Sequence, residues 1–143
     1  MTSIVEFMTQ DHRHCDEIYA AAEEKVAAGR WDEAAQSWEI FRNALETHLN
    51  REESFLFPAF EAQTGNTQGP TAVMRMEHEQ MRSLVSAMDE AIVATDADSF
   101  LGLAETLMIL AQQHNMKEEQ ILYPMSDQVL GDPDMLIRQM QEG

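Results

Sequence analysis

Several features are scarce or missing in this chain of 143 residues, and each absence excludes a class of protein. A single cysteine, Cys15, cannot form an internal disulfide, so the chain is not a disulfide-stapled scaffold. No apolar run approaches the roughly 18 residues of a membrane-spanning helix. Strand signals are weak, because few β-branched runs occur. With 44% hydrophobic residues, the chain has enough apolar material to bury a core, and its length corresponds to one domain.

Basic residues are also scarce, with 9 Lys and Arg against 26 Asp and Glu, and the formal net charge is −17. This charge repels the phosphates of nucleic acids and the surface of anionic membranes. We therefore expect no nucleic-acid partner and no membrane partner. Residues 1–8 contain neither a cationic segment nor an apolar signal core, so the expected compartment is the cytoplasm.

The apolar residues recur at helical rather than alternating spacing, as in Met74, Met81, Val85 and Met88. Turn signals lie at Gly29 and at residues 64–70, 95–98 and 131–133. The sequence therefore predicts an all-α fold, an up-down-up-down four-helix bundle with helices of about 25 residues. Gly29 is expected just past the end of the first helix, and Asp32 and Asp98 as N-caps of the second and fourth.

The chain contains an internal repeat that becomes visible when it is shifted by 66 positions, a shift that takes His12 to His78. The same shift aligns residues 48–58, HLNREESFLFP, with residues 114–124, HNMKEEQILYP, without a gap. The bundle is therefore predicted to be a duplicated helical hairpin with pseudo-twofold symmetry. Residues 1–143 form a single domain in this interpretation, with repeat halves at about 3–62 and 70–126 and a tail at 127–143.

The tail leaves two alternatives open. Its apolar residues Met135, Ile137 and Met140 follow Asp132 and Pro133, an arrangement that suits a short fifth helix. Such a helix would dock on the bundle or on a second chain. The other alternative is a frayed end.

Four of the five histidines lie on the repeat, together with two glutamates. His48 and Glu52 are four residues apart, so they share one helix face about 6 Å apart along the axis. His114 and Glu118 repeat this spacing. His12 and His78 lie on the apolar stripes of the first and third helices. The six side chains predicted to point into the core are His12, His48, Glu52, His78, His114 and Glu118.

A core that holds four imidazoles and two carboxylates is unstable unless they have partners. One alternative is a buried polar network in which histidines donate to glutamates. The duplicated spacing instead favours a metal site, and imidazole with carboxylate suits iron, manganese or zinc. Six ligands are too many for one tetrahedral zinc but fit two metals, each with two histidines and bridged by both glutamates. An oxo or hydroxo bridge would leave about one position open on each metal for a small molecule.

The histidine and glutamate pattern resembles the hemerythrin-like family, the HHE cation-binding domains, over about residues 3–126. The Glu-Glu-x-x-Leu-aromatic-Pro stretches at 52–58 and 118–124 are similar to that family as well. The resemblance implies a non-haem di-iron centre with an oxo or hydroxo bridge. Carried over by position, its implied ligands are His12, His48, Glu52, His78, His114 and Glu118.

Two departures separate the chain from the oxygen-carrying hemerythrins. Met74 stands where those proteins have an additional histidine, and His114-x-x-x-Glu118 replaces their His-x-x-x-x-Asp. The symmetric set of four histidines and two glutamates looks more like the di-iron domain of the iron-centre repair proteins. The resemblance therefore favours a di-iron site without favouring reversible oxygen transport.

Other polar residues near these positions have competing interpretations. His14 is about 200° around the helix from His12, so it is expected at the surface. Cys15 is either a small core residue or a thiol that tunes a nearby metal. Tyr19 lies two turns from His12, and one alternative is that its hydroxyl reaches a carboxylate beside the site. Glu53 and Glu119 are about 100° off the ligand face and are expected to be solvated or to support the ligands, not to coordinate.

The predicted function is a non-haem di-iron protein that binds or senses O2, NO or peroxide at open iron positions. Alternatives are an iron donor in the repair of damaged iron centres, and a di-iron enzyme that acts on peroxide or NO. A metal-free helical interaction protein is the remaining class. No catalytic residue is assigned, and a protein partner or a homodimer would use the C-terminal tail.

Overall fold

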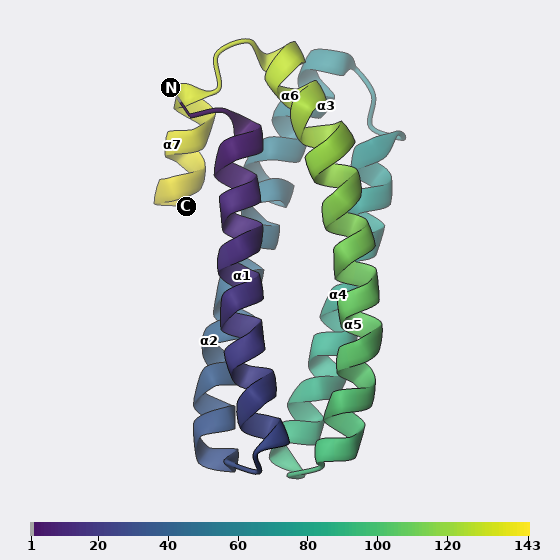
Figure 1. Cartoon of the computed structure of the whole chain (residues 1–143). Coiled ribbons are helices and arrows are strands. Elements are labelled where there is room, and N and C mark those ends of the chain that lie inside the picture. The colour runs from purple at the N-terminus through teal and green to yellow at the C-terminus, as the bar shows by residue number, and fades with distance from the viewer. Residues whose placement is uncertain (1) are drawn as a thin grey trace.

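A computed structural model describes residues 2–143, and within them it contains helices and turns but no strand. The long helices are roughly antiparallel and alternate in direction along the chain (Figure 1). They are α1 (Ile4–Ala27), α2 (Trp31–Arg51), α4 (Pro70–Val93) and α5 (Ala97–Lys117). The prediction of an all-α bundle is confirmed. None of the helices in the described residues is long and apolar enough to cross a membrane.

The second helix of each hairpin is longer than the sequence indicated, because it continues through a widened π-helical turn and past a proline. The chain continues from α2 through η1 (Glu52–Leu56) into α3 (Phe57–Thr64), and from α5 through η2 (Glu118–Leu122) into α6 (Tyr123–Leu130). Phe57 donates its backbone N–H to the Glu52 carbonyl five residues earlier, and Tyr123 does the same to Glu118. A proline follows each of these aromatic residues and lacks the N–H that a regular turn would use. The wider turn accommodates this missing donor.

The helix starts differ from the two predicted N-caps. Asp96, not Asp98, caps α5, and its carboxylate accepts the backbone N–H of Ser99 at 3.1 Å. Arg30 occupies the cap position of α2 without a side-chain hydrogen bond, so Asp32 lies inside the first turn. Both helices begin earlier than the apolar pattern indicated, because a residue in the left-handed region completes each preceding turn. Those residues are Gly29 (φ 72°), whose predicted place is confirmed, and Thr95 (φ 51°).

The apolar core is divided into two clusters along the bundle. The cluster near the α1–α2 and α4–α5 turns contains Tyr19, Trp38, Phe41, Met88 and Phe100. The cluster at the other end contains Ile4, Leu56, Phe57, Phe60, Tyr123 and Met140. The histidines and glutamates of the repeat lie between the two clusters, so apolar side chains shield them along the bundle axis.

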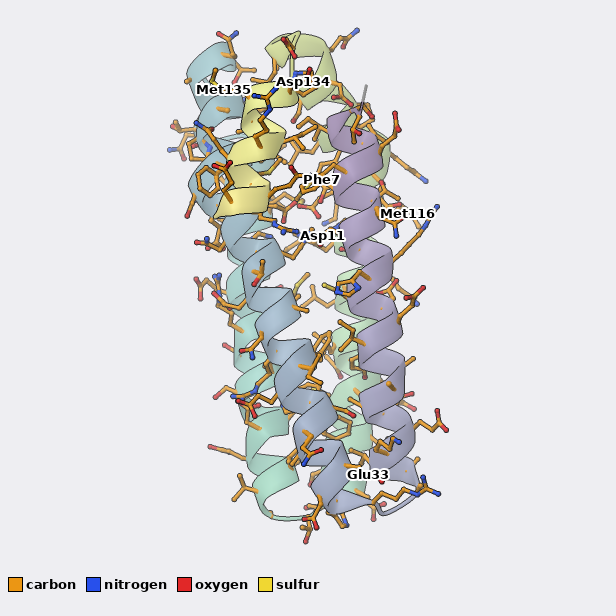
Figure 2. The ribbon with its side chains drawn as sticks, turned by 90° about the vertical axis from the view of Figure 1, so that its left-hand side faces the viewer. Phe7, Asp11, Glu33, Met116, Asp134 and Met135 are labelled. Carbon is orange, nitrogen blue, oxygen red and sulfur yellow. The ribbon has the colours of Figure 1, made fainter. Side chains whose placement is uncertain are left out.

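The C-terminal tail forms the short fifth helix, α7 (Asp134–Glu142), which packs against η1 (Figures 1 and 2). Ile137 and Met140 are buried there. Arg51 donates its Nε–H to the backbone carbonyl of Met140 at 2.9 Å. Of the two alternatives for the tail, the helix is therefore confirmed, and it docks on its own bundle.

Candidate metal centre

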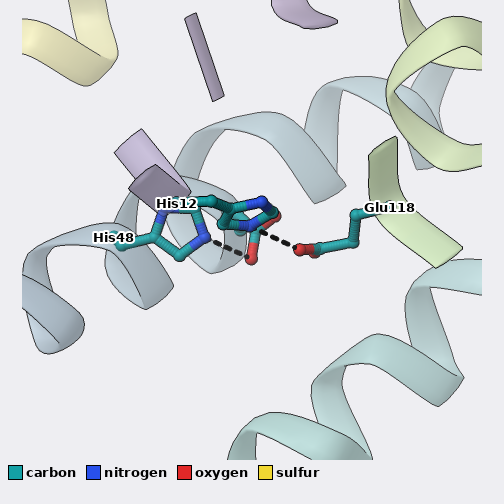
Figure 3. A group of neighbouring side chains, drawn as sticks. His12, His48 and Glu118 are labelled. Carbon is teal, nitrogen blue, oxygen red and sulfur yellow. Dashed lines mark hydrogen bonds and ion pairs between the residues drawn. The ribbon is translucent and has the colours of Figure 1, made fainter. Parts of the chain in front are cut away.

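The bundle brings all six predicted side chains together in its interior, each at most 4% exposed. They form two overlapping groups of four. One contains His12, His48, Glu52 and Glu118, and the other contains Glu52, His78, His114 and Glu118. Within each group, one ligand atom from every residue lies within 4.8 Å of the others. Figure 3 shows His12, His48 and Glu118 converging from three different helices.

Both glutamates reach across the bundle to a histidine of the other hairpin. Nε2 of His12 lies 3.1 Å from Oε1 of Glu118, and Nε2 of His78 lies 2.9 Å from Oε1 of Glu52. The imidazole rings pair on either side, with centroids 4.6 Å apart for His12 and His48. The other two rings, His78 and His114, are 5.0 Å apart. The two histidine pairs therefore flank a pair of shared carboxylates.

The π-helical turns begin at the two glutamates, so the local backbone helps to position them. Glu52 is the first residue of η1 and Glu118 the first of η2. The glutamates still follow His48 and His114 by four residues, and the turn widens only after them. Such π-helical turns occur frequently at functional sites. Regular helical spacing could not have predicted them.

Each of the four histidines is held from behind by a carboxylate on its Nδ1 atom. The distances are 2.7 Å for His12 with Glu119, 2.8 Å for His48 with Asp11, 2.7 Å for His78 with Glu53 and 2.8 Å for His114 with Glu77. An ionised carboxylate only accepts hydrogen bonds, so each Nδ1 is the donor. This directs the Nε2 atoms toward the glutamates, as in metal-binding histidines. Glu53 and Glu119 thus support the ligands, one of the two roles expected for them.

Asp11 and Glu77 are supporting residues that sequence reasoning missed. Arg51 lies 2.9 Å from Asp11, and Lys117 forms the equivalent pair with Glu77. Although burial opposes it, these bases and the histidines hold the pKa of both carboxyls below the ordinary value. The repeat contained the signal, because a shift of 66 positions takes Asp11 to Glu77 and Arg51 to Lys117.

Three buried polar atoms at the centre have no hydrogen-bond partner within residues 2–143. They are Nε2 of His48, Nε2 of His114 and Oε2 of Glu118; the two nitrogens lie 3.5 and 3.2 Å from a glutamate oxygen without forming a hydrogen bond. An unpaired buried polar group costs about 1–3 kcal/mol, so three in one place require an explanation. All three are atoms that can bind a metal, and all belong to residues of the two four-residue groups. The residues present therefore fit a bound cation at each group.

Burial and the neighbouring charges shift the pKa values of these residues. Burial, followed by the adjacent Glu118 carboxylate, raises the pKa of Glu52. Burial lowers the pKa of His48, which keeps this imidazole neutral and able to coordinate. For His12, burial acts downward, but hydrogen bonding to Glu118 and the nearby carboxylates raise the pKa to about 9. A cation would replace the protons that these groups otherwise share.

The structure also places three neighbouring residues of α1 whose roles the sequence left open. His14 is exposed, as expected. Cys15 is 7% exposed, and burial, followed by Asp11 and Asp16, raises the pKa of its thiol to about 12. The hydroxyl of Tyr19 donates to Glu23 at 3.0 Å. Tyr19 therefore reaches a carboxylate on its own helix and not one of the carboxylates that support the histidines.

Sequence reasoning did not single out Tyr123, which is fully buried at the centre. Its hydroxyl lies 2.6 Å from Oε2 of Glu52, 3.0 Å from Oε1 of Glu118 and 3.1 Å from Nε2 of His12. The available signal was its place in the repeat, where the 66-residue shift aligns Tyr123 with Phe57. One half therefore carries a polar atom where the other half is apolar.

A small cavity of about 40 Å³ adjoins the histidines. Its lining includes His12, Cys15, Tyr19, His48, Met81 and His114. A volume of this size holds a diatomic molecule or about three to four waters, since one water needs about 10–15 Å³. Asp16 and Asn115 line the cavity and also a surface groove, so the cavity lies close to solvent between α1 and α5.

Comparison with families of known proteins shows which family the chain matches. The hemerythrin HHE cation binding domain matches residues 3–126, a span that includes all six predicted ligands. No curated protein and no solved structure matches the chain. The matched family and the buried cluster agree on the general chemistry, which is the binding of a metal cation.

Proposed function

Because this chain belongs to the hemerythrin HHE cation-binding domain family, we propose that it holds two iron ions and binds a small molecule at them. The observation that carries the proposal is the pair of four-residue groups sharing Glu52 and Glu118. Iron in such a centre supplies redox chemistry and open coordination positions for O2, NO or peroxide.

The residues divide into two symmetric sets in this proposal. His12 and His48 hold one iron, and His78 and His114 hold the other. Glu52 and Glu118 contribute to both positions, because each group of four contains both carboxylates. An oxo or hydroxo bridge would offset the positive charge that two glutamates leave uncompensated.

The surroundings of the site support a small ligand. The cavity beside His12, His48 and His114 has about 40 Å³, too little for an organic substrate of ordinary size. Its other lining residues are mostly apolar, including Leu49 and Leu107. Such walls exclude bulk water and favour a neutral diatomic molecule over a hydrated ion.

Retention of the metal is favoured over its donation to another protein. All six proposed ligands are buried, and a carboxylate on Nδ1 fixes each histidine. Releasing iron would require this interior to open. We therefore place ligand binding or sensing ahead of iron donation, and we assign no residue to catalytic turnover.

A homodimer through the C-terminal helix stays a prediction. Ile137 and Met140 already pack on the bundle, whereas Met135 on the same helix is 73% exposed. Met135 is therefore the apolar residue of α7 that a second chain would contact. Sedimentation of wild-type protein and of Met135→Lys tests this, because only a dimer formed through α7 would dissociate in the variant.

The deciding experiment is metal analysis of purified protein, combined with anaerobic loading with ferrous iron and ultraviolet–visible spectroscopy. About two irons per chain are expected, with charge-transfer bands of a bridged ferric pair that bleach on reduction. Re-exposure to air or addition of NO then shows whether a small molecule binds at the metals. Protein that contains no metal, and takes up none when loaded, would contradict the proposal.

A further inference from the structure

The two halves of the centre differ in one buried atom, the hydroxyl oxygen of Tyr123. We propose that this oxygen is a seventh protein ligand, bound to the metal held by His12 and His48. The inference rests on the proposed di-metal function and adds to it an inequivalence between the two metal positions. Nothing in the spacing of the histidines and glutamates requires such a difference.

The position of the hydroxyl matches that of a metal ligand. Atoms bound at right angles to one metal, with bond lengths of 2.0–2.2 Å, lie about 3 Å from each other. The Tyr123 oxygen lies 2.6, 3.0 and 3.1 Å from atoms of Glu52, Glu118 and His12. All three residues belong to the same group of four. The oxygen therefore already stands at ligand-to-ligand distances from that group.

The hydroxyl has hydrogen-bond partners only among the proposed ligands. Tyr123 is fully buried, and within residues 2–143 its three contacts are the atoms given above. A metal bound to Glu52, Glu118 and His12 takes up the imidazole lone pair and weakens the carboxylate oxygens as acceptors for the hydroxyl. A buried hydroxyl left unpaired costs about 1–3 kcal/mol. Coordination removes this cost, with the phenol proton released to solvent, as other ligands release theirs when a metal binds.

The equivalent oxygen is absent on the other side of the centre. Phe57 occupies the position related to Tyr123 by the repeat, and its ring stacks on His78 with centroids 5.5 Å apart. The Tyr123 ring lies 5.6 Å from that of His12 in the matching arrangement. The backbone places both aromatic rings alike, directly after a π-helical turn. The difference in ligand number therefore depends on a single oxygen atom.

The inference is tested by the colour of iron-loaded protein after oxidation. A phenolate bound to ferric iron produces a charge-transfer band in the visible region, and excitation into this band enhances the phenolate ring vibrations in the resonance Raman spectrum. The chain has only two tyrosines, so Tyr19→Phe is a matched control. We expect Tyr123→Phe to keep both irons and lose the band, and Tyr19→Phe to keep the band.

The possible outcomes separate this inference from the proposed function. Two irons per chain without a phenolate band in the wild type, or a band that survives Tyr123→Phe, would overturn the ligand assignment alone. Failure to bind iron would overturn the proposed function and this inference together. Should Tyr123→Phe not fold, ring-deuterated tyrosine is incorporated into wild-type protein and into Tyr19→Phe. In Tyr19→Phe the label is present only at Tyr123, so an isotope shift of the enhanced vibrations there identifies Tyr123 as the bound phenolate.

Discussion

The two hairpins of the bundle present the same metal-facing atoms, but their surroundings differ. In the first, His48 is supported by Asp11 and Arg51, and in the second His114 is supported by Glu77 and Lys117. Each hairpin thus supplies a histidine, a carboxylate that supports its Nδ1 atom, and a basic residue that binds this carboxylate. The repeat preserves the elements needed to hold two cations.

The supports of the other two histidines show the difference. Glu53, behind His78, is bound by Arg82 through two nitrogens at 2.9 Å each. Glu119, behind His12, instead lies near Asp16, the residue that the repeat aligns with Arg82. Burial and then Glu119 raise the pKa of Asp16 against an opposing effect of His12.

The surroundings of His12 and His78 therefore differ. Tyr123 and Asp16 are beside the His12 position, whereas Phe57 and the pair of Arg82 with Glu53 are beside the His78 position. The small cavity adjoins both sets, because His12, His48 and His114 all line it. The comparison indicates that holding two cations requires symmetric ligands, while the environment of each cation is free to diverge.

The largest effect is expected where the halves are equivalent. His48→Ala and His114→Ala should each lose at least one metal and destabilise loaded protein by about 3 kcal/mol, because buried charges lose a partner. Metal analysis and thermal unfolding measure this. Metal content and melting temperature that survive both substitutions would show that the site is assigned incorrectly.

A smaller but again equal effect is expected from the supporting carboxylates. Asp11→Ala and Glu77→Ala should each weaken metal binding about 10–100-fold, because His48 and His114 lose the groups that orient them. Competition with a chelator of known affinity gives the values. A loss in only one of the two variants would mean that the supports are not equivalent.

The aromatic difference should be transferable between the halves. The double substitution Phe57→Tyr with Tyr123→Phe moves the hydroxyl to the His78 side and is expected to restore the phenolate band that Tyr123→Phe alone removes. Extra volume beside His78 should lower stability by about 1–3 kcal/mol. Absorption spectra and unfolding curves of the single and double variants provide the test. A double variant without the band would mean that a tyrosine oxygen can bind the metal only on the His12 side.

Substitutions of Arg82 and of Asp16, which the repeat aligns with each other, should change stability in opposite directions. Arg82→Gln should destabilise the protein by about 1 kcal/mol, since Glu53 loses its cation. Asp16→Asn should stabilise it by a few tenths of a kcal/mol at neutral pH, because ionised Asp16 has a raised pKa and opposes folding. As the pH falls below the unfolded-state pKa, near 4, this gain should disappear. Urea unfolding at neutral and acidic pH measures both, and equal signs would contradict the comparison.

The smallest effect is expected at the histidine outside the repeat. His14→Ala removes an exposed side chain, so metal content should be unchanged and stability should stay within about 0.5 kcal/mol. His14 is two residues from His12, which makes it a control for helix register. Loss of a metal in this variant would move the proposed ligand from His12 to His14.

The sequence by itself determined the helical pattern, the duplication and the six residues that converge in the core. These features depend on spacing within a helix, where four residues make about one turn and place two side chains on one face. His48 and Glu52 could therefore be paired from their spacing alone. The match over residues 3–126 confirms the family that this pattern resembled.

Only the tertiary structure decided which groups meet across helices. Asp11 reaches His48 and Tyr123 reaches His12 over separations of 37 and 111 residues, which helix packing alone controls. The π-helical turns after Glu52 and Glu118 also change the register, so the aromatic residue that follows each turn cannot be placed by regular helical spacing. The local periodicity of one helix thus specifies which face is buried, whereas the partners on that face depend on how the helices pack against one another.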